Sequence, residues 1–335
     1  MKPSLSSVEE ALSEIKSLIE KHHSFVLLEH QKPDGDCVGS GLALVQVLQS
    51  LGKQALLVSQ DPHPAVYDFL PGSEFHTRAQ YIDPEDFRAE VAVFIDCTDP
   101  ERAGKGLDLA RNSIWVNIDH HISNTGFGDV SLVLPDAAAT GEIIYKLLIA
   151  AGVPITKEIA TCLYVAIATD TGGFRYQNTT QETFEIAGAL TGYGANPWEI
   201  AELIFETRTV SSVLLLGKAL NTLKLSRGGK LATVSVTRDM MAQAGASPDE
   251  TEGIIGYPRS ISGVEVSLLF REMEDGSGFH VSFRSRSKVD VSKIAVKLGG
   301  GGHPRAAGAL VKGTLEEASQ KVLAILDELD IWTDS

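Results

Sequence analysis

The sequence predicts an α/β protein with an N-terminal doubly wound domain on a mainly parallel sheet and a smaller C-terminal α/β domain with a mixed sheet. In the N-terminal half, continuous apolar runs of strand length alternate with helical patterns, which is typical of strands covered on both faces. In the C-terminal half, apolar and polar residues alternate along the strands instead. The length of 335 residues also exceeds what one hydrophobic core usually organises. We expect a first domain at residues 1–191, a connector at 192–209 and a second domain at 210–335.

The elements of the N-terminal half follow one another in a regular order. After an amphipathic opening helix, we expect strands at 25–29, 55–58, 91–95 and 114–118. Helices are expected at 39–51, 139–151 and 157–169, and a loop at His30–Cys37. In parallel sheets of this kind, ligands bind beyond the carboxyl ends of the strands. The residues that follow these strands are therefore the first place to look for a functional site.

The C-terminal half shows a different pattern of elements. A long helix is expected at 210–225, followed by strands near 231–236, 264–271 and 279–284 and helices near 291–298 and 315–329. The turn sequence EDGSG separates two of these strands, which is typical of an antiparallel hairpin. This sheet is therefore expected to be mixed or antiparallel.

Composition and charge restrict the class of protein. The formal net charge of −15 disfavours generic attraction to long nucleic acids, for which a basic surface normally supplies the affinity. No apolar run approaches the length of a membrane span, and the opening residues lack a signal-peptide pattern. Three widely separated cysteines, Cys37, Cys97 and Cys162, favour a reducing compartment, and we interpret them as buried fillers rather than nucleophiles. We expect a cytoplasmic protein without membrane contact.

Carboxylate and imidazole side chains follow three of the expected strands and one expected helix. They are His30, Asp34, Asp36, Asp96, Asp119, His120, His121 and Asp170. Each has an ordinary explanation by itself, such as a helix cap or a turn, but a parallel sheet would bring all four segments to one edge. Divalent cations are the natural compensation for such a self-repelling cluster. The mixed ligands favour Mn²⁺, with Mg²⁺, Co²⁺, Fe²⁺ or Zn²⁺ as alternatives.

The order and spacing of these residues resemble the four motifs of the DHH phosphoesterase superfamily over nearly the whole chain. The resemblance implies the DHH fold and two divalent metal ions. It divides the ligands into His30 and Asp34 for one ion, Asp36, His120 and Asp170 for the other, and Asp96 as a bridge between them. It also implies that His121 lies beside the scissile phosphate as a positioning group or proton donor, and that Asp119 orients His120. By this resemblance, Asp96 and His121 are the catalytic residues.

A second motif, in the C-terminal half, predicts a grip on phosphate. Four glycines, Gly299–Gly302, are followed directly by His303 and by Ala306–Gly308, a pattern that is uncommon in flexible linkers and resembles the DHH-associated C-terminal domain. Glycines let backbone N–H groups approach an anion closely. Upstream, basic and hydroxyl side chains are concentrated at the end of the strand expected near 279–284, and such side chains can bind phosphate through hydrogen bonds. The candidate substrate-binding residues are Arg284, Ser285, Gly301, Gly302 and His303, with Arg286, Lys288 and Arg305 as weaker candidates.

Within the superfamily, the two-domain organisation most resembles the nano-RNases, which are bifunctional oligoribonucleases and phosphatases of 3′-phosphoadenosine-5′-phosphate (PAP). The expected activity is hydrolysis of very short oligoribonucleotides to mononucleotides, together with conversion of PAP to AMP. Long-strand binding would call for a basic groove with interleaved aromatic residues, and no binding of long duplex DNA is expected. Two alternatives stay open, namely a phosphodiesterase for linear dinucleotides such as pApA and a nucleotide-binding regulator without turnover. The sequence also leaves a homodimer open.

Overall fold

The structure is a computed structural model that describes residues 5–286 and 289–328. The side chains of residues 5–7 and of His303 also lie outside the described part. The chain divides between Thr207 and Arg208 into two compact units, and each is described by itself. In the described part of the chain, no helix has the length and apolar character that crossing a membrane requires.

The first unit is built on a parallel sheet with the strand order β3-β2-β1-β4-β5-β6. The strands are β1 (Ser24–Glu29), β2 (Gln54–Ser59), β3 (His76–Arg78), β4 (Val91–Ile95), β5 (Ile114–Asp119) and β6 (Val130–Val133). The helices are α1 (Leu5–Lys21), α2 (Gly35–Ser50), α3 (Thr140–Ala151), α4 (Lys157–Asp170), α5 (Gln181–Gly192) and α6 (Pro197–Ala201). The order reverses between β1 and β4, which is the switch point at which doubly wound proteins bind their ligands.

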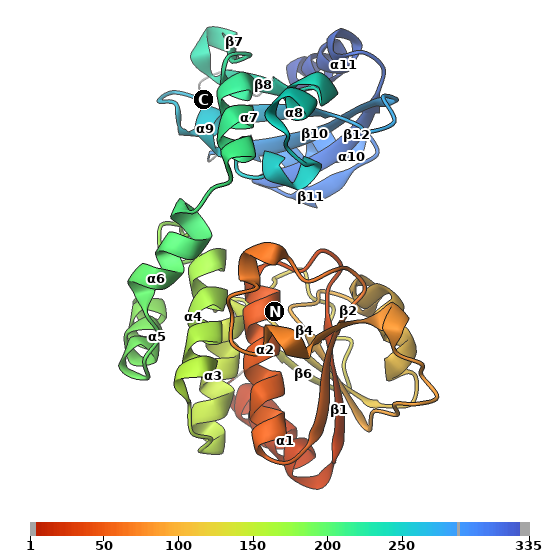
Figure 1. The fold of residues 1–335 in the computed structure, drawn as a ribbon, viewed down its shortest axis with the longest axis vertical. Coiled ribbons are helices and arrows are strands. Elements are labelled where there is room, and N and C mark those ends of the chain that lie inside the picture. The colour runs from red at the N-terminus through yellow and green to blue at the C-terminus, as the bar shows by residue number, and fades with distance from the viewer. Residues whose placement is uncertain (1–4, 287–288, 329–335) are drawn as a thin grey trace. The chain divides into compact units, whose positions relative to one another are not determined.

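The two faces of this sheet are covered differently. Phe25 and Leu27 of β1 point into a core formed with α2, α3 and α4, and Figure 1 shows these helices together on one side of the sheet. The alternate residues Val26 and Leu28 point into a second core. That core is completed by η4 (Pro100–Ala110), a 3₁₀ segment with a kink at Gly104. The parallel sheet covered on both faces is therefore confirmed, although an irregular segment covers one of them.

The expected loop His30–Cys37 is shorter in the structure, because α2 begins at Gly35. Asp34 caps this helix, since its Oδ1 accepts a hydrogen bond from the backbone N–H of Cys37 at 3.1 Å. A Cβ at Gly35 would lie 2.4 Å from Thr169 Cγ2 of α4, so the start of α2 packs against the end of α4. Asp36 is consequently a helical residue and its direction is set by helix geometry.

The second unit contains a mixed sheet with the order β11-β12-β10-β9-β8-β7, in which β8 and β9 are parallel and the other pairs antiparallel. The strands are β7 (Lys224–Ser226), β8 (Leu231–Val236), β9 (Val266–Glu272), β10 (Gly278–Ser285), β11 (Gly301–His303) and β12 (Ala306–Lys312). The helices are α7 (Val210–Leu220), α8 (Arg238–Ala244), α9 (Gly256–Ser260), α10 (Val291–Lys297) and α11 (Leu315–Glu328). The expected mixed sheet is confirmed.

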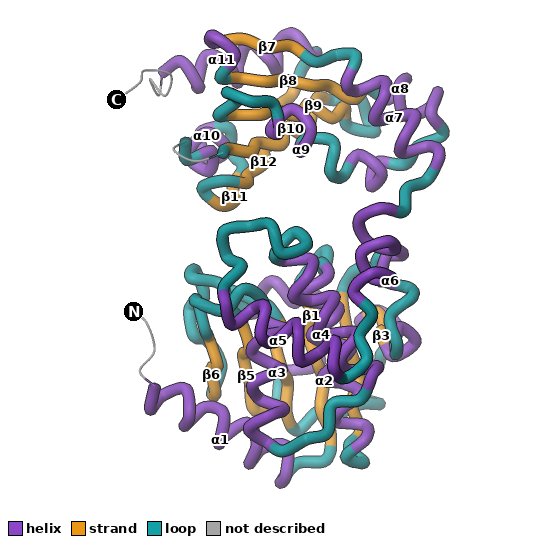
Figure 2. The backbone as a smooth tube through the Cα atoms, turned by 90° about the vertical axis from the view of Figure 1, so that its left-hand side faces the viewer, coloured by secondary structure: helices purple, strands orange, loops and turns teal. Residues whose placement is uncertain are grey.

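Both faces of the second sheet are also covered by helices. Leu268 and Phe270 of β9 pack with α10 and α11, whereas Leu269 between them packs with α7 and α8. Figure 2 shows the two helix pairs apart from each other, with the strands between them. The helix expected at 210–225 ends earlier, at Leu220, and β7 follows it along the sheet edge.

Candidate metal and phosphate-binding sites

The structure brings all the acidic and imidazole residues predicted from the sequence to one edge of the first sheet. His30 and Asp96 directly follow β1 and β4, the two strands at the switch point. Asp119 is the last residue of β5, and His120 and His121 follow it. Asp34 and Asp36 stand at the N-terminus of α2, and Asp170 is the last residue of α4.

Within the described residues, three sets of these side chains have ligand atoms that all lie within 4.8 Å of one another. The sets are His30, Asp34 and Asp96; Asp36, His120 and Asp170; and Asp96, His120 and His121. The first two sets coincide with the two groups of ligands that the family resemblance implies. In each of these two sets, three carboxylate or imidazole donors at this spacing fit a divalent cation.

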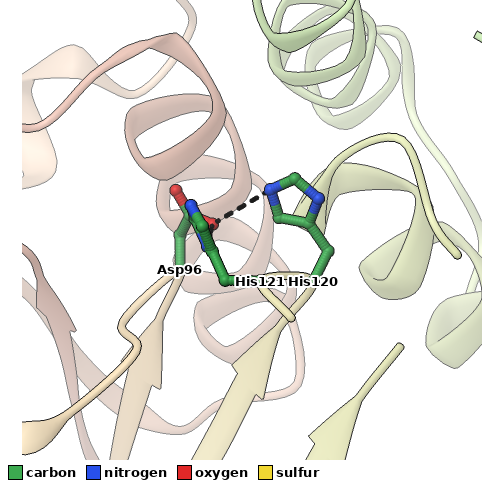
Figure 3. Close-up of side chains that lie close together, drawn as sticks. All are labelled: Asp96, His120 and His121. Carbon is green, nitrogen blue, oxygen red and sulfur yellow. Dashed lines mark ion pairs between the residues drawn. The ribbon is translucent and has the colours of Figure 1, made fainter. Parts of the chain in front are cut away.

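Asp96 lies between the two groups. Its Oδ2 is 3.6 Å from Nε2 of His30, whereas its Oδ1 is 3.7 Å from Nε2 of His120 and 3.4 Å from Nδ1 of His121. Figure 3 shows both histidine rings beside this carboxylate. The two oxygens of a single carboxylate therefore face one ligand group each, which is the geometry that a bridging ligand requires.

The position of Asp96 is fixed by an unusual backbone conformation and by hydrogen bonds. Its φ of 57° lies in the left-handed region, which costs a non-glycine residue roughly 1–3 kcal/mol. Its backbone N–H donates to the carbonyl of Ile118 at 2.9 Å, and the hydroxyl of Thr140 donates to its Oδ1 at 2.9 Å. The surrounding structure thus holds a strained residue in place at the centre of the cluster.

The pKa values of Asp36 and Asp170 are raised in the cluster. Burial, together with the charges of Asp96 and Asp170, raises the pKa of Asp36 well above its usual value. Burial also raises the pKa of Asp170 to about 6, against the opposing attraction of His120. Asp36 is nevertheless well held, because its carboxylate accepts hydrogen bonds from the backbone N–H groups of Thr140 and Gly141 at 2.6 and 3.0 Å. Bound cations would remove the repulsion between these carboxylates.

The histidines have the opposite effect on Asp96. Burial by itself would raise the pKa of Asp96, but hydrogen bonds from His121 and His30 hold it well below the usual value. Burial likewise disfavours the charged form of His121, yet its hydrogen bonds to Asp119 and Asp96 raise its pKa to about 10. In the metal-free chain, His121 is therefore a cation at neutral pH.

The resemblance implies that Asp119 orients the side chain of His120, but in the structure the ring that Asp119 contacts is that of His121. Oδ1 of Asp119 lies 2.7 Å from Nδ1 of His121, whereas Nδ1 of His120 lies 3.2 Å from the carbonyl oxygen of Ala137. The same Oδ1 accepts hydrogen bonds from the backbone N–H groups of both histidines, at 2.8 and 3.2 Å. Asp119 thus fixes the path of the chain through both residues but the ring of only one. Only the folded backbone decides this pairing, because both rings are adjacent to Asp119 in the sequence.

Three further residues contact the cluster and were not singled out from the sequence. Thr140 serves both Asp36 and Asp96, and its position at the beginning of an expected helix was the only available signal. The side-chain amide of Asn178 donates to the carbonyls of Ala138 and Asp170, at 3.0 and 3.2 Å. Asn124 donates to Asp119. Isolated asparagines in loops carry no periodic pattern that could reveal such contacts.

In the second unit, the expected phosphate-binding residues lie on β10 and β11, the two strands that pair with β12 on either side. Arg284 and Ser285 end β10, and Arg284 pairs across the sheet with Ala306 of β12. The Arg284 side chain is half-buried and donates from Nη1 to the carbonyl of Phe283 at 3.0 Å. Ser285 is buried, and its hydroxyl lies 3.4 Å from the carbonyl oxygen of Pro304. The structure therefore places both residues beside the segment that connects β11 to β12.

The glycine run has a structural role besides the expected contact with phosphate. A Cβ at Gly300 would lie 2.1 Å from the carbonyl oxygen of Gly308, and one at Gly302 would lie 2.5 Å from Cα of Ala307. These two glycines are thus required by the close approach of β12. Gly301 has open space around it and is exposed, as is Gly302. The side chain of His303 and the whole of Lys288 lie outside the described residues.

Comparisons with known proteins agree with the fold. Residues 24–167 match the N-terminal domain of the DHH family, and residues 228–330 match the DHHA1 domain. The chain is 39% identical to the bifunctional oligoribonuclease and PAP phosphatase NrnA of Thermus thermophilus, covering 90% of this chain and 88% of that protein. It is 28% identical to the NrnA protein of Bacillus subtilis, over 95% and 98% of the two chains.

Solved structures show the same architecture. An exopolyphosphatase-related protein from Bacteroides fragilis superposes with a TM-score of 0.91 at 26% identity, over 96% of each chain. RecJ of Thermus thermophilus with Mn²⁺ superposes with a TM-score of 0.56 at 15% identity, over 98% of this chain and 56% of RecJ, and shares the fold alone. A doubly wound domain with a His and Asp cluster at its switch point, followed by a DHHA1 domain, defines a metal-dependent phosphoesterase. The chain belongs to the DHH family of phosphoesterases and is a hydrolase.

Proposed function

We propose that this chain hydrolyses very short oligoribonucleotides to mononucleotides and converts PAP to AMP. The observation that carries the proposal is the complete set of acidic and imidazole side chains around Asp96, in a chain whose relatives of similar length are named for these two activities. Intact donors at every position favour an enzyme over a regulator that has lost turnover. The buried, unpaired thiols of the three cysteines fit a reducing compartment, and we assign the protein to the cytoplasm.

We assign two divalent cations to the cluster, with Mn²⁺ as the favoured ion. His30 and Asp34 would hold one, Asp36, His120 and Asp170 the other, and Asp96 both. Bound divalent ions supply Lewis acidity and a water of lowered pKa. Carboxylate donors suit Mn²⁺, and the added imidazoles favour a transition metal over Mg²⁺.

The chain's own residues have separate tasks in this proposal. Asp96, held in its strained turn, keeps the two ligand groups at a fixed spacing. His121 has Nδ1 engaged by Asp119, and we assign it to the scissile phosphate as a positioning group or proton donor. Asp119 keeps this ring in one orientation. The helix N-terminus at Thr140 and Gly141 holds Asp36.

In the second unit, we assign substrate capture to Arg284, Ser285, Gly301, Gly302 and His303. A guanidinium at a strand end can bind a phosphate through two parallel hydrogen bonds, which Lys cannot do. Gly301 adds an exposed backbone with space around it, which an anion can approach. These residues would hold a phosphate of the nucleotide that is not being cleaved.

The proposal is tested with purified protein and a panel of substrates in Mn²⁺. The panel contains a dinucleotide, pApA, a longer oligoribonucleotide, PAP and inorganic pyrophosphate, with products identified by mass spectrometry. We expect mononucleotides from the short RNAs and AMP from PAP. Turnover of pApA alone would favour the linear-dinucleotide phosphodiesterase. Tight binding of dinucleotides without any product would favour the regulator and contradict the proposal.

A further inference from the structure

Asn124 lies in the loop between β5 and β6, three residues beyond His121. Its neighbours in the loop, Ile122, Ser123 and Thr125, are exposed, whereas Asn124 itself is half-buried. The side chain therefore turns inward from a loop whose other residues face solvent. The ligand sets assigned above do not include it.

The amide of Asn124 reaches three acceptors that belong to two separate segments. Its Nδ2 lies 3.0 Å from the carbonyl oxygen of Cys97, 2.8 Å from Oδ1 of Asn117 and 2.5 Å from Oδ2 of Asp119. An amide group has two hydrogens, so these three acceptors share them. The other end is also engaged, because Oδ1 accepts a hydrogen bond from the backbone N–H of Gly126 at 2.6 Å. Reversing the amide would place its NH₂ against that N–H, and the orientation is therefore determined.

These acceptors are next to the residues that matter most in the metal cluster. Cys97 directly follows Asp96, the strained residue between the two ligand groups. Asp119 directly precedes His120 and uses its other oxygen for Nδ1 of His121. Asn124 thus connects the turn after β4 with the turn after β5, and it supplies the hydrogen bond to Oδ2 of a carboxylate that is fully buried.

The far end of the loop is anchored well enough to hold Asn124 in place. The ring of Phe127 packs edge-on against Phe94 and Trp115, with centroids 5.1 and 6.3 Å apart. Oδ2 of Asp129 accepts a hydrogen bond from the backbone N–H of Trp115 at 2.8 Å. Gly128 passes so close to β5 that a Cβ there would lie 3.0 Å from the backbone nitrogen of Asn117. The loop is therefore a fixed support and not a loose connection.

We propose that Asn124 is a positioning residue, which holds the turn after Asp96 and the carboxylate of Asp119 in register and thereby aligns both ligand groups and the His121 ring. This inference rests on the proposed function only for its kinetic readout. An amide donor against a buried carboxylate is the interaction that matters, because the donor fixes Asp119 without adding charge. Replacement by an isosteric acid would keep the volume but set two carboxylates side by side.

The test compares Asn124→Ala and Asn124→Asp with Ser123→Ala, an exposed control in the same loop. Mn²⁺ binding to the metal-free protein is measured by calorimetry, kcat and KM are measured on a dinucleotide, and folding is checked by circular dichroism. Residues that support metal ligands typically contribute about 10- to 100-fold to metal affinity or activity. We expect Asn124→Ala to lower Mn²⁺ affinity and kcat within that range at nearly unchanged KM, Asn124→Asp to lower both further, and the control to equal the natural protein.

A merely space-filling role predicts the reverse order, with the isosteric Asp variant better than the Ala variant. That order, or natural values for both variants, would overturn the proposal. If the Asp variant does not fold, the Ala variant decides through the split between kcat and KM. If the natural protein turns over no substrate, the proposed function fails, while the Mn²⁺ titrations still decide the role of Asn124.

Discussion

The two units of this protein assemble their candidate sites in opposite ways. In the first unit, the side chains come from four segments spread between His30 and Asp170 and meet at the end of a parallel sheet. In the second unit, Arg284 and Ser285 lie on β10, which pairs with one edge of β12, and the short glycine strand β11 pairs with the other edge. The first site is mostly buried and dense in charge, whereas the glycines of the second are exposed.

This difference suits the two sites to different tasks, namely chemistry in the first unit and substrate capture in the second. Chemistry that depends on fixed distances benefits from buried groups held by several hydrogen bonds, as Asp36 and Asp119 are. Capture of a phosphate tolerates looser geometry and needs access from solvent. Changes in the first site should therefore act on turnover, and changes in the second should act on substrate affinity. Four predictions test that contrast, from the largest expected effect to the smallest.

The largest effect is expected for Asp96→Ala. Bound metal ions lower the activation free energy by several kcal/mol, and each change of about 1.4 kcal/mol corresponds to a tenfold change in rate. Loss of this metal ligand should therefore lower kcat roughly 1,000-fold or more. The measurement is turnover of a dinucleotide at saturating substrate with Mn²⁺. Asp86→Ala, which removes an exposed carboxylate elsewhere in the same unit, is the matched control. An Asp96→Ala variant as active as this control would remove the two-metal mechanism.

The next effect is expected for Asp119→Asn. The neutral amide keeps the shape but loses the charge that holds Nδ1 of His121 and raises its pKa. We expect kcat to fall by about 10- to 100-fold with little change in KM, in line with other residues that support a metal site. Steady-state kinetics on PAP and on a dinucleotide give the two constants. A rise in KM at constant kcat would place Asp119 in substrate binding instead.

A smaller effect is expected for Arg284→Ala, and it should act on KM and not on kcat. Loss of a hydrogen bond to a charged group costs about 1.5–3 kcal/mol, which corresponds to a rise in KM of about tenfold or more. The value of kcat should stay within a few-fold, because the metal cluster is untouched. Arg271→Ala on the neighbouring strand β9 serves as the control cation. Equal losses of kcat in the Arg284 and Asp96 variants would erase the contrast between the two units.

The smallest effect concerns pH. The raised pKa of Asp170, about 6, means that the metal-free protein holds a proton on this carboxylate below that pH, and a cation must displace it. This one proton should therefore leave the affinity for Mn²⁺ unaffected above about pH 7 and lower it by at most about tenfold per unit below pH 6. Calorimetric titrations between these values measure the slope. Affinity that rises on acidification would contradict the assigned role of Asp170.

Much of the first site could be predicted from the sequence because its logic is periodic. Continuous apolar strands imply a parallel sheet, and residues after such strands meet at one edge whatever the details of packing. By that reasoning Asp96 and His120, which follow β4 and β5, belong at the same edge, and the structure brings them together there. The same reasoning missed β3 and β6, since strands of three or four residues are too short to show a usable pattern. It also began α2 too late, because Gly35 hides the start of a helix that packs closely on α4.

The sequence by itself determined the class of fold, the family and the chemical character of the cluster, because these follow from residue type, order and strand periodicity. Only the tertiary structure decided which ring Asp119 holds, that Thr140 serves two carboxylates, and that Asn124 joins two turns. It also decided that Gly300 and Gly302 are needed for strand pairing. Hydrogen bonds of this kind depend on tenths of an ångström between segments far apart along the chain, and no spacing of letters encodes such distances.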